Sequence, residues 1–156
     1  MIHPRKELFK AIKERLKLQE NKPVWIDYWR NQTAEKKVPF NYPACFVSVS
    51  IGGYEDMTVN QKVGNATIDV RFVFEKFQDT FEGSEDQEQS LELMDQVELW
   101  AESLHFLEGE TFEEITQVAD VDITEQIGKP AFLVQFTSVV HKIINPPTNV
   151  FRAPRT

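Results

Sequence analysis

The chain is poor in the residues on which most metal and catalytic sites depend. Its 156 residues include one cysteine, Cys45, and three histidines, His3, His105 and His141. A single cysteine excludes an intramolecular disulfide and a two-cysteine metal motif. No two histidines have metal-ligand spacing, and no GxGxxG, GxxxxGK[ST] or GxSxG motif occurs. We therefore predict a protein that is not an enzyme and that holds neither a metal nor a cofactor.

Long hydrophobic runs are also missing, and positive charge is in the minority. No apolar segment approaches the roughly 20 residues that cross a bilayer, and the first residues, MIHPRKELFKAIKERLK, have no signal-peptide core. The chain has 17 Lys and Arg against 25 Asp and Glu, for a formal net charge of −8. This balance argues against a general nucleic-acid-binding protein, because phosphate contacts need a basic surface. We expect a protein made in the cytoplasm, with no membrane partner.

Hydrophobic periodicity predicts a single α+β domain over residues 1–144. Residues 4–18 have helical spacing, and a second helix is predicted from an N-cap at Ser84 to about residue 106. Strands are predicted at 23–29, 44–51, 65–77, 112–128 and 130–144. The fold class that fits this order is one mostly antiparallel sheet of about five strands, with both helices packed on one face. Residues 145–156 are rich in proline, and we expect an extended or disordered tail.

Three strand patterns make specific predictions about burial. In 65–77 every second residue from Ala66 is apolar, which is typical of a sheet covered on one side and leaves Val73 facing out. In 112–128 the apolar residues share one face only if a bulge falls near 119–120; they are Ile115, Val118, Val121 and Ile123. Cys45 alternates with apolar residues in 44–51, so we predict a buried thiol that takes no part in catalysis.

Acidic residues are concentrated in the second predicted helix and the turn before it. Ten acids and one cation, Lys76, lie between Glu75 and Glu102. Exposed carboxylates lack the burial and the specific partner that a catalytic dyad needs. Three interpretations stay open: a solvated surface, a lining past which DNA slides without binding, or a face that binds a basic patch on a neighbouring copy. The candidate acidic surface comprises Glu85, Asp86, Glu88, Glu92, Asp95, Glu98 and Glu102.

Two other segments are candidates for contacts with partners. The first predicted helix carries six basic residues, which form either a solvated face or a patch for a partner or DNA. The segment 52–63 has little to bury, and we expect a mobile loop or a projecting hairpin arm; the loop 30–42 and the tail are further candidates. The candidate oligomer or tube interface comprises Gly52, Gly53, Tyr54, Glu55, Asp56, Met57, Asn60, Gln61 and Lys62, together with Phe151 and Arg152 of the tail.

The order of these segments resembles that of the phage tail terminator family, also called tail-completion or minor tail proteins. The resemblance covers residues 4–142 and is carried by RKELFKAIKERLK, YPACFVSVSI, NATIDVRFVFEKF, EGSEDQEQSLELMDQVELWAESL and AFLVQFTSVVHK. It implies a one-sheet α+β fold that assembles into a ring, commonly of six copies, on the end of the tail tube. The implied partners are the chain itself, the tail tube protein and the head-side connector protein, with DNA passing through the ring without sequence-specific binding. The implied location is the host cytoplasm during assembly and then the virion tail.

Two other functions fit the same sequence. One is a head-closure or neck protein, or a tail component of an injection device, which sequence patterns do not separate from a terminator. The other is a ligand-binding α+β module unrelated to phage. Such a module needs a concave apolar pocket with convergent polar groups, and Trp25, Trp29 and Tyr54 are the residues that would line it.

Overall fold

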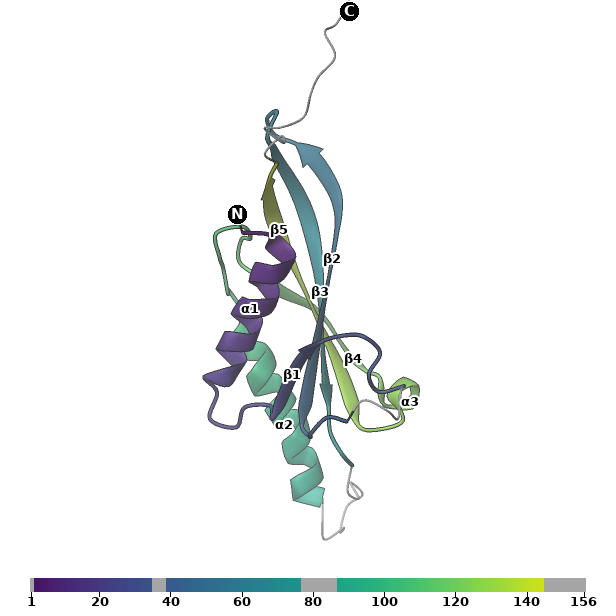
Figure 1. Cartoon of the computed structure of the whole chain (residues 1–156). Helices are drawn as coiled ribbons and strands as arrows, with labels where there is room; N and C mark the ends of the chain where they lie inside the picture. Colours follow the sequence, from purple (N-terminus) through teal and green to yellow (C-terminus); the bar gives the residue numbers. More distant parts are fainter. Residues whose placement is uncertain (1, 35–38, 77–86, 145–156) are drawn as a thin grey trace, which may run out of the picture.

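The structure, a computed structural model, describes residues 2–34, 39–76 and 87–144. Along the chain the elements are α1 (Pro4–Lys17), β1 (Trp25–Tyr28), β2 (Ala44–Asp56), β3 (Gln61–Val73), α2 (Gln87–Leu104), β4 (Thr116–Asp122), α3 (Thr124–Ile127) and β5 (Ala131–Ile143) (Figure 1). The strands form one five-stranded sheet in the order β1-β2-β3-β5-β4. β1 is parallel to β2, and every other neighbouring pair is antiparallel. The predicted α+β fold with a mostly antiparallel sheet is confirmed.

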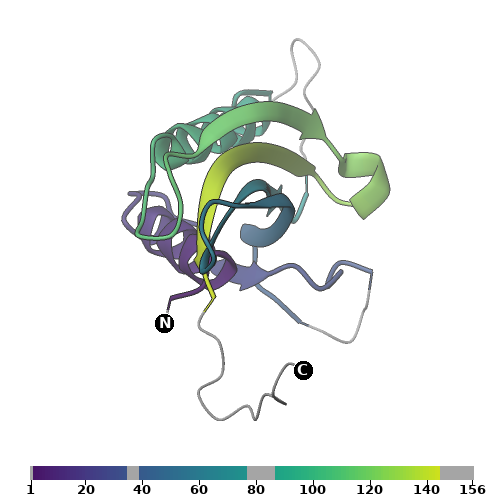
Figure 2. The same cartoon turned by 90° about the horizontal axis from the view of Figure 1, so that it is seen from above.

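The main core lies between the sheet and the two long helices, which cover the same face (Figure 2). Each element brings apolar residues at its own period, every third or fourth residue in the helices and every second in the strands. Burial of one such Leu, Ile or Phe side chain stabilises the fold by about 1.5–3 kcal/mol. The fully buried side chains of this core include Leu8, Ile12 and Leu16 of α1, Leu104 of α2, Cys45 and Val47 of β2, Ile68, Val70 and Phe72 of β3, and Val134, Phe136 and Val140 of β5.

The opposite face of the sheet carries a second, smaller core that the sequence pattern did not predict. Its buried members are Ala44, Phe46, Val73, Ile123 and Ala131, and partly buried aromatic residues of β1 and of the loop after it pack against them. Val73 was predicted to face solvent and is fully buried here. The prediction was wrong because distant segments, the loop before β2 and the short helix α3, cover this end of the sheet (Figure 1).

The segment 112–128 differs from its prediction. β4 occupies only its middle, and the unpredicted helix α3 follows at once. A register shift between Gln117 and Ala119 supplies the expected bulge. The bulge does not bring the apolar residues to one face, because Val121 pairs with Leu133 on the opposite face from the main core. Val118 and Val121 are therefore 55% and 46% exposed, while Ile115 joins the main core and Ile123 the second.

Trp100 links α2 to both the sheet and the turn after α1, and its replacement tests the main core. Its ring stacks on Phe74 with centroids 6.0 Å apart, and its indole N–H donates to the carbonyl of Asn21 at 2.9 Å. We expect Trp100→Phe to lower the free energy of unfolding by about 2 kcal/mol, through a residual cavity and a lost hydrogen bond. Urea unfolding measures the change. The matched control is Leu99→Ala on the exposed side of α2, with an expected change within about 0.5 kcal/mol; equal losses in both variants would contradict this account.

Candidate functional site

The predicted loop 52–63 is a hairpin arm, which we define as residues 52–62. Here β2 and β3 continue together beyond the helices, and β5 runs beside them (Figure 1). The backbone N–H of Met57 donates to the carbonyl of Gln61 at 2.9 Å and closes the turn. Of the two predicted forms, mobile loop or projecting arm, the structure has the second.

Pairing and one aromatic contact hold the arm where there is little core. A register shift between Gly52 and Glu55 marks a bulge, and Gly53 has a φ of 65°, which favours glycine. The Tyr54 ring lies so close to Gly64 that an added Cβ there would come within 2.8 Å of it. The Lys142 ammonium lies 5.7 Å from the centroid of the same ring. Tyr54 therefore fixes the base of the arm against β3 and β5.

The tip of the arm exposes two apolar side chains to solvent, next to two more at the end of β5. Met57 is 61% exposed and Val59 is fully exposed, and Ile143 and Ile144 at the end of β5 are exposed as well. Exposed apolar groups that cluster in this way are typical of protein contact sites. All nine candidate interface residues of segment 52–62 lie on this arm. The other two candidates, Phe151 and Arg152, lie outside the described residues.

The acidic face of α2 is exposed as predicted, and the acidic surface continues onto a neighbouring strand. Glu92, Asp95, Glu98 and Glu102 are exposed, and α2 has no basic residue in its last turn. The side chain of Glu88 lies outside the described residues, as do Glu85 and Asp86. Beside this face, β4 adds Asp120 and Asp122, which the predicted acidic surface did not include. We call the six exposed acids of α2 and β4 the acidic edge: Glu92, Asp95, Glu98, Glu102, Asp120 and Asp122.

Like charges meet at the acidic edge. The pKa of Glu98 is raised by a hydrogen bond with Asp120, then by partial desolvation, and then by the negative charges of Asp120 and Glu102. A sequence signal for this extension exists, since no Lys or Arg occurs anywhere from Gln87 to Gly128. In the isolated molecule the ionised form of Glu98 is therefore disfavoured, and a basic partner would relieve that repulsion.

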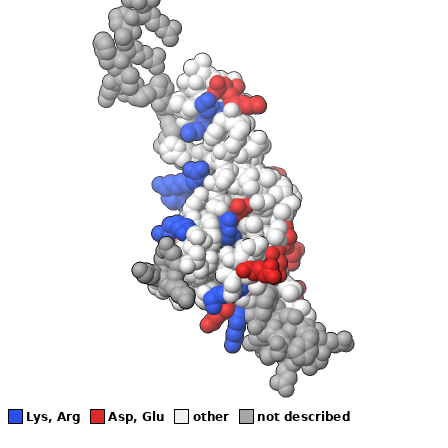
Figure 3. Space-filling model, turned by 90° about the vertical axis from the view of Figure 1, so that its right-hand side faces the viewer, with Lys and Arg blue, Asp and Glu red and all other residues white. Residues whose placement is uncertain are grey.

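A basic counterpart lies at the other end of the sheet, and the candidate interface residues named from the sequence did not include it. A groove of about 530 Å³ between α1 and β1 is lined by Lys13, Lys17, Lys22, Pro23, Val24, Trp25 and Ile26. We call it the lysine groove. Lys13 and Lys17 are four residues apart on one face of α1, which was the available sequence signal. In Figure 3 the basic side chains of the middle of the molecule lie mostly to the left and the acidic ones mostly to the right.

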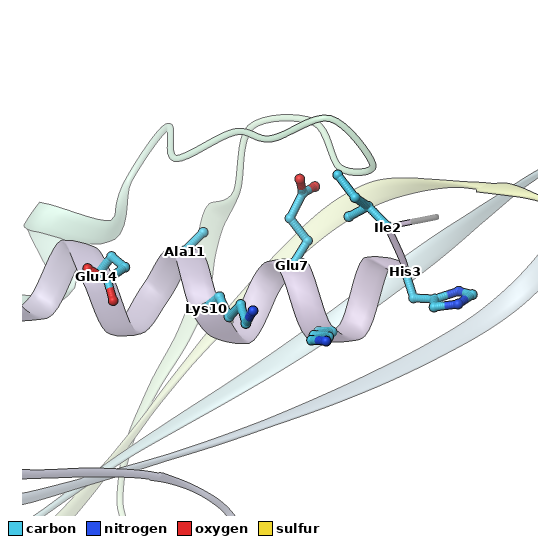
Figure 4. Close-up of a pocket in the computed structure, with 7 residues that line it drawn as sticks. Ile2, His3, Glu7, Lys10, Ala11 and Glu14 are labelled. Carbon is cyan, nitrogen blue, oxygen red and sulfur yellow. The ribbon is translucent and has the colours of Figure 1, made fainter.

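A second hollow runs along α1, and the charged residue Glu7 in its lining has a structural role. It measures about 460 Å³ and is lined by Ile2, His3, Lys6, Glu7, Lys10, Ala11 and Glu14 (Figure 4). The Glu7 carboxylate points toward the loop before β4 and accepts hydrogen bonds from the Thr111 N–H and hydroxyl, both at 2.8 Å, and from the Glu110 N–H at 3.2 Å. Glu7 thus anchors that loop to α1, and the rest of the lining mixes both charges without a convergent set of groups.

The described residues contain no cluster of reactive side chains. Among them, no three His, Cys, Asp or Glu side chains are grouped so that they could hold a metal ion. Cys45 is buried as predicted, and burial raises the pKa of its thiol. His141 lies 3.4 Å from the Glu113 carboxylate at the surface, and His105 lies 3.4 Å from the Gln117 side chain. None of the helices in the described part of the chain is long and apolar enough to cross a membrane.

The pocket required by the ligand-binding alternative does not form from the residues suggested for it. Trp25 and Trp29 pack in the second core, whereas Tyr54 packs against the main core at the base of the arm. Arg71 stacks on Trp29, with the guanidinium carbon 4.6 Å from the ring centroid, and donates to the Ser48 hydroxyl at 3.0 Å. Trp29 is therefore engaged in contacts within the fold.

No protein-family model matches the chain, and no curated protein matches it with significance.

Replacement of Asp120 by Asn tests the repulsion at the acidic edge. A carboxyl with a raised pKa favours the folded state when protonated, and that contribution is lost as the pH rises through its folded pKa. We expect Asp120→Asn to stabilise the dilute monomer slightly at pH 7, because it removes one charge next to Glu98. The gain should vanish at about pH 3, where Glu98, whose pKa is raised, is protonated and carries no charge to be repelled. Thermal unfolding at the two pH values measures it, and a gain of the same size at both would refute the explanation.

Proposed function

We propose that this chain is a structural phage tail protein, a tail terminator, whose copies join in a ring that caps the tail tube and meets the head-side connector. One observation carries the proposal: a single open sheet has a basic groove at its β1 end and an acidic edge at its β4 end. Two different, complementary patches on one molecule favour a heterologous contact between copies. Repetition of such a contact produces a ring when the rotation closes.

The hairpin arm gives such a ring two unlike ends. The arm extends along the strand direction beyond both long helices (Figure 1). If the ring axis is parallel to the strands, every copy presents its arm at the same end of the ring. The exposed apolar tip, Met57 and Val59, then forms a repeated contact site for another ring-shaped partner. A terminator needs this polarity because it meets a tube on one side and a connector on the other.

The acidic edge also bears on the third implied partner, DNA. Acidic surface near a central passage repels phosphate and lets DNA move without binding. The six acids of the acidic edge would lie between subunits in the ring that we propose, so repulsion of DNA rests on the acids outside that contact. The resemblance in segment order supports a tail terminator over an unrelated ring-forming protein.

Assembly is tested on the purified chain by light scattering and electron microscopy. We expect concentration-dependent oligomers and rings at about 50 mM salt that weaken toward about 500 mM, because screening shortens the reach of exposed charges. Added tail tubes should carry the protein at one end only. A neck protein would bind connector complexes and leave tube ends bare. A strict monomer at every concentration, with and without tubes or connectors, would overturn the proposal.

A further inference from the structure

Both outer strands of the sheet have an open side within the described residues. β1 pairs only with β2, and β4 pairs only with β5. On the open side of β1, few backbone groups are free to pair with another strand. The Tyr28 N–H donates to the Asp27 carboxylate at 2.8 Å, and the Tyr28 carbonyl accepts from the Gln32 side chain at 2.7 Å. Just before the strand, the Val24 N–H donates to the Pro43 carbonyl at 2.9 Å. The backbone of Ile26, at the lysine groove, is the position left to pair with another strand.

The backbone directions at β4 can be derived from one hydrogen bond. The Ile123 N–H donates to the Ala131 carbonyl at 2.9 Å, so this pair faces β5. Because hydrogen-bonded and non-bonded pairs alternate in an antiparallel ladder, the backbone groups of Asp120 and Asp122 point to the open side. Their side chains lie on the helix-covered face, opposite Val134 and Phe132. Val121 lies on the other face and is 46% exposed.

We infer that β4 of one copy adds to the β1 edge of the next copy, with Ile26 opposite Asp120 of the neighbour; this rests on the proposed ring. The strand directions fit. β1 runs with β2, and three antiparallel steps lead from β2 to β4, so β4 runs opposite to β1. Copies related by rotation about an axis parallel to the strands thus meet as an antiparallel pair.

The register follows from both faces of the sheet. Ile26 and Asp120 both have outward backbone groups, and both side chains lie on the helix-covered face, as directly opposed residues must. Asp120 and Asp122 then enter the lysine groove beside Lys13 and Lys17. On the other face, Trp25 meets the exposed Val121. A shift by two residues would place Asp120 opposite Tyr28, whose backbone groups already have partners.

Charge reversal with mixing tests the pairing of these two surfaces. Variant one is Lys13→Glu with Lys17→Glu, and variant two is Glu98→Lys with Asp120→Lys. Each alone should raise the apparent dissociation constant of assembly at least about 100-fold, because like charges then face each other. An equal mixture should assemble in strict alternation, since both kinds of contact become complementary. The matched control, Lys6→Glu with Lys10→Glu, changes the charge of α1 equally outside the groove and should assemble like the wild type.

A cross-link tests the register itself. Val24→Cys with Asp122→Cys places two thiols across from each other in the inferred register, where opposed Cα atoms lie about 4.5–5.5 Å apart, a distance that a disulfide can bridge. Cys45 is buried and does not compete. Oxidation should give a ladder of covalent oligomers on a non-reducing gel, whereas Val24→Cys with Asp120→Cys, two residues out of register, should give far less.

The outcomes separate the inference from the proposed function. Wild-type rings together with unaffected charge variants, or with a mixture that does not assemble, would overturn the strand pairing and leave the ring proposal standing. Equal cross-linking in both registers would also overturn it. A wild-type chain that never assembles would overturn both.

Discussion

Burial of one face of β2, β3 and β5 beneath α1 and α2 is the interaction on which the rest of the structure depends. These three strands have 13 residues each, whereas the outer strands β1 and β4 have four and seven. Long paired strands in the centre supply the stability, and short strands at the sides limit uncontrolled edge pairing. Because the core does not need further strands, the two ends of the sheet and the arm are free to serve recognition.

The parts of the fold that were predictable are those in which a single segment contains its own signal. β3 and β5 alternate so regularly that their core residues, from Ala66 to Phe74 and from Val134 to Val140, could be assigned directly. The second core could not, because Val73 is buried by segments distant in the sequence. The arm has little apolar content, and its order comes from pairing with β5 and from the contact of Tyr54 with Gly64.

The same distinction applies to the candidate site. The acidic residues of α2 and the basic residues of α1 could be predicted as charged surfaces from the sequence. Their positions at opposite ends of one sheet could not, because these positions depend on the strand order. Glu7 is an example of a role that the sequence does not predict. In the sequence it is one more charge on a charged helix, but in the structure its carboxylate accepts hydrogen bonds from the backbone N–H and the hydroxyl of Thr111. Charge content is a property of segments, whereas charge complementarity is a property of the folded molecule.

Solubility alone does not explain where the charges lie. A net charge of −8 keeps a protein of this size in solution wherever the acids are placed. Dispersed placement would avoid the close approach of Glu98 to Asp120, whose hydrogen bond and negative charge both raise the pKa of Glu98. The chain instead has 12 acids and no Lys or Arg from Gln87 to Gly128, while three lysines line the groove at β1. In an isolated molecule this segregation is only a cost. Between two copies the same charges attract, and because the two surfaces differ, each copy retains one of each for its next neighbour. A chain of such contacts closes only if the rotation per copy divides a full turn, so in the proposed ring the twist of the sheet between β1 and β4 would set the number of subunits.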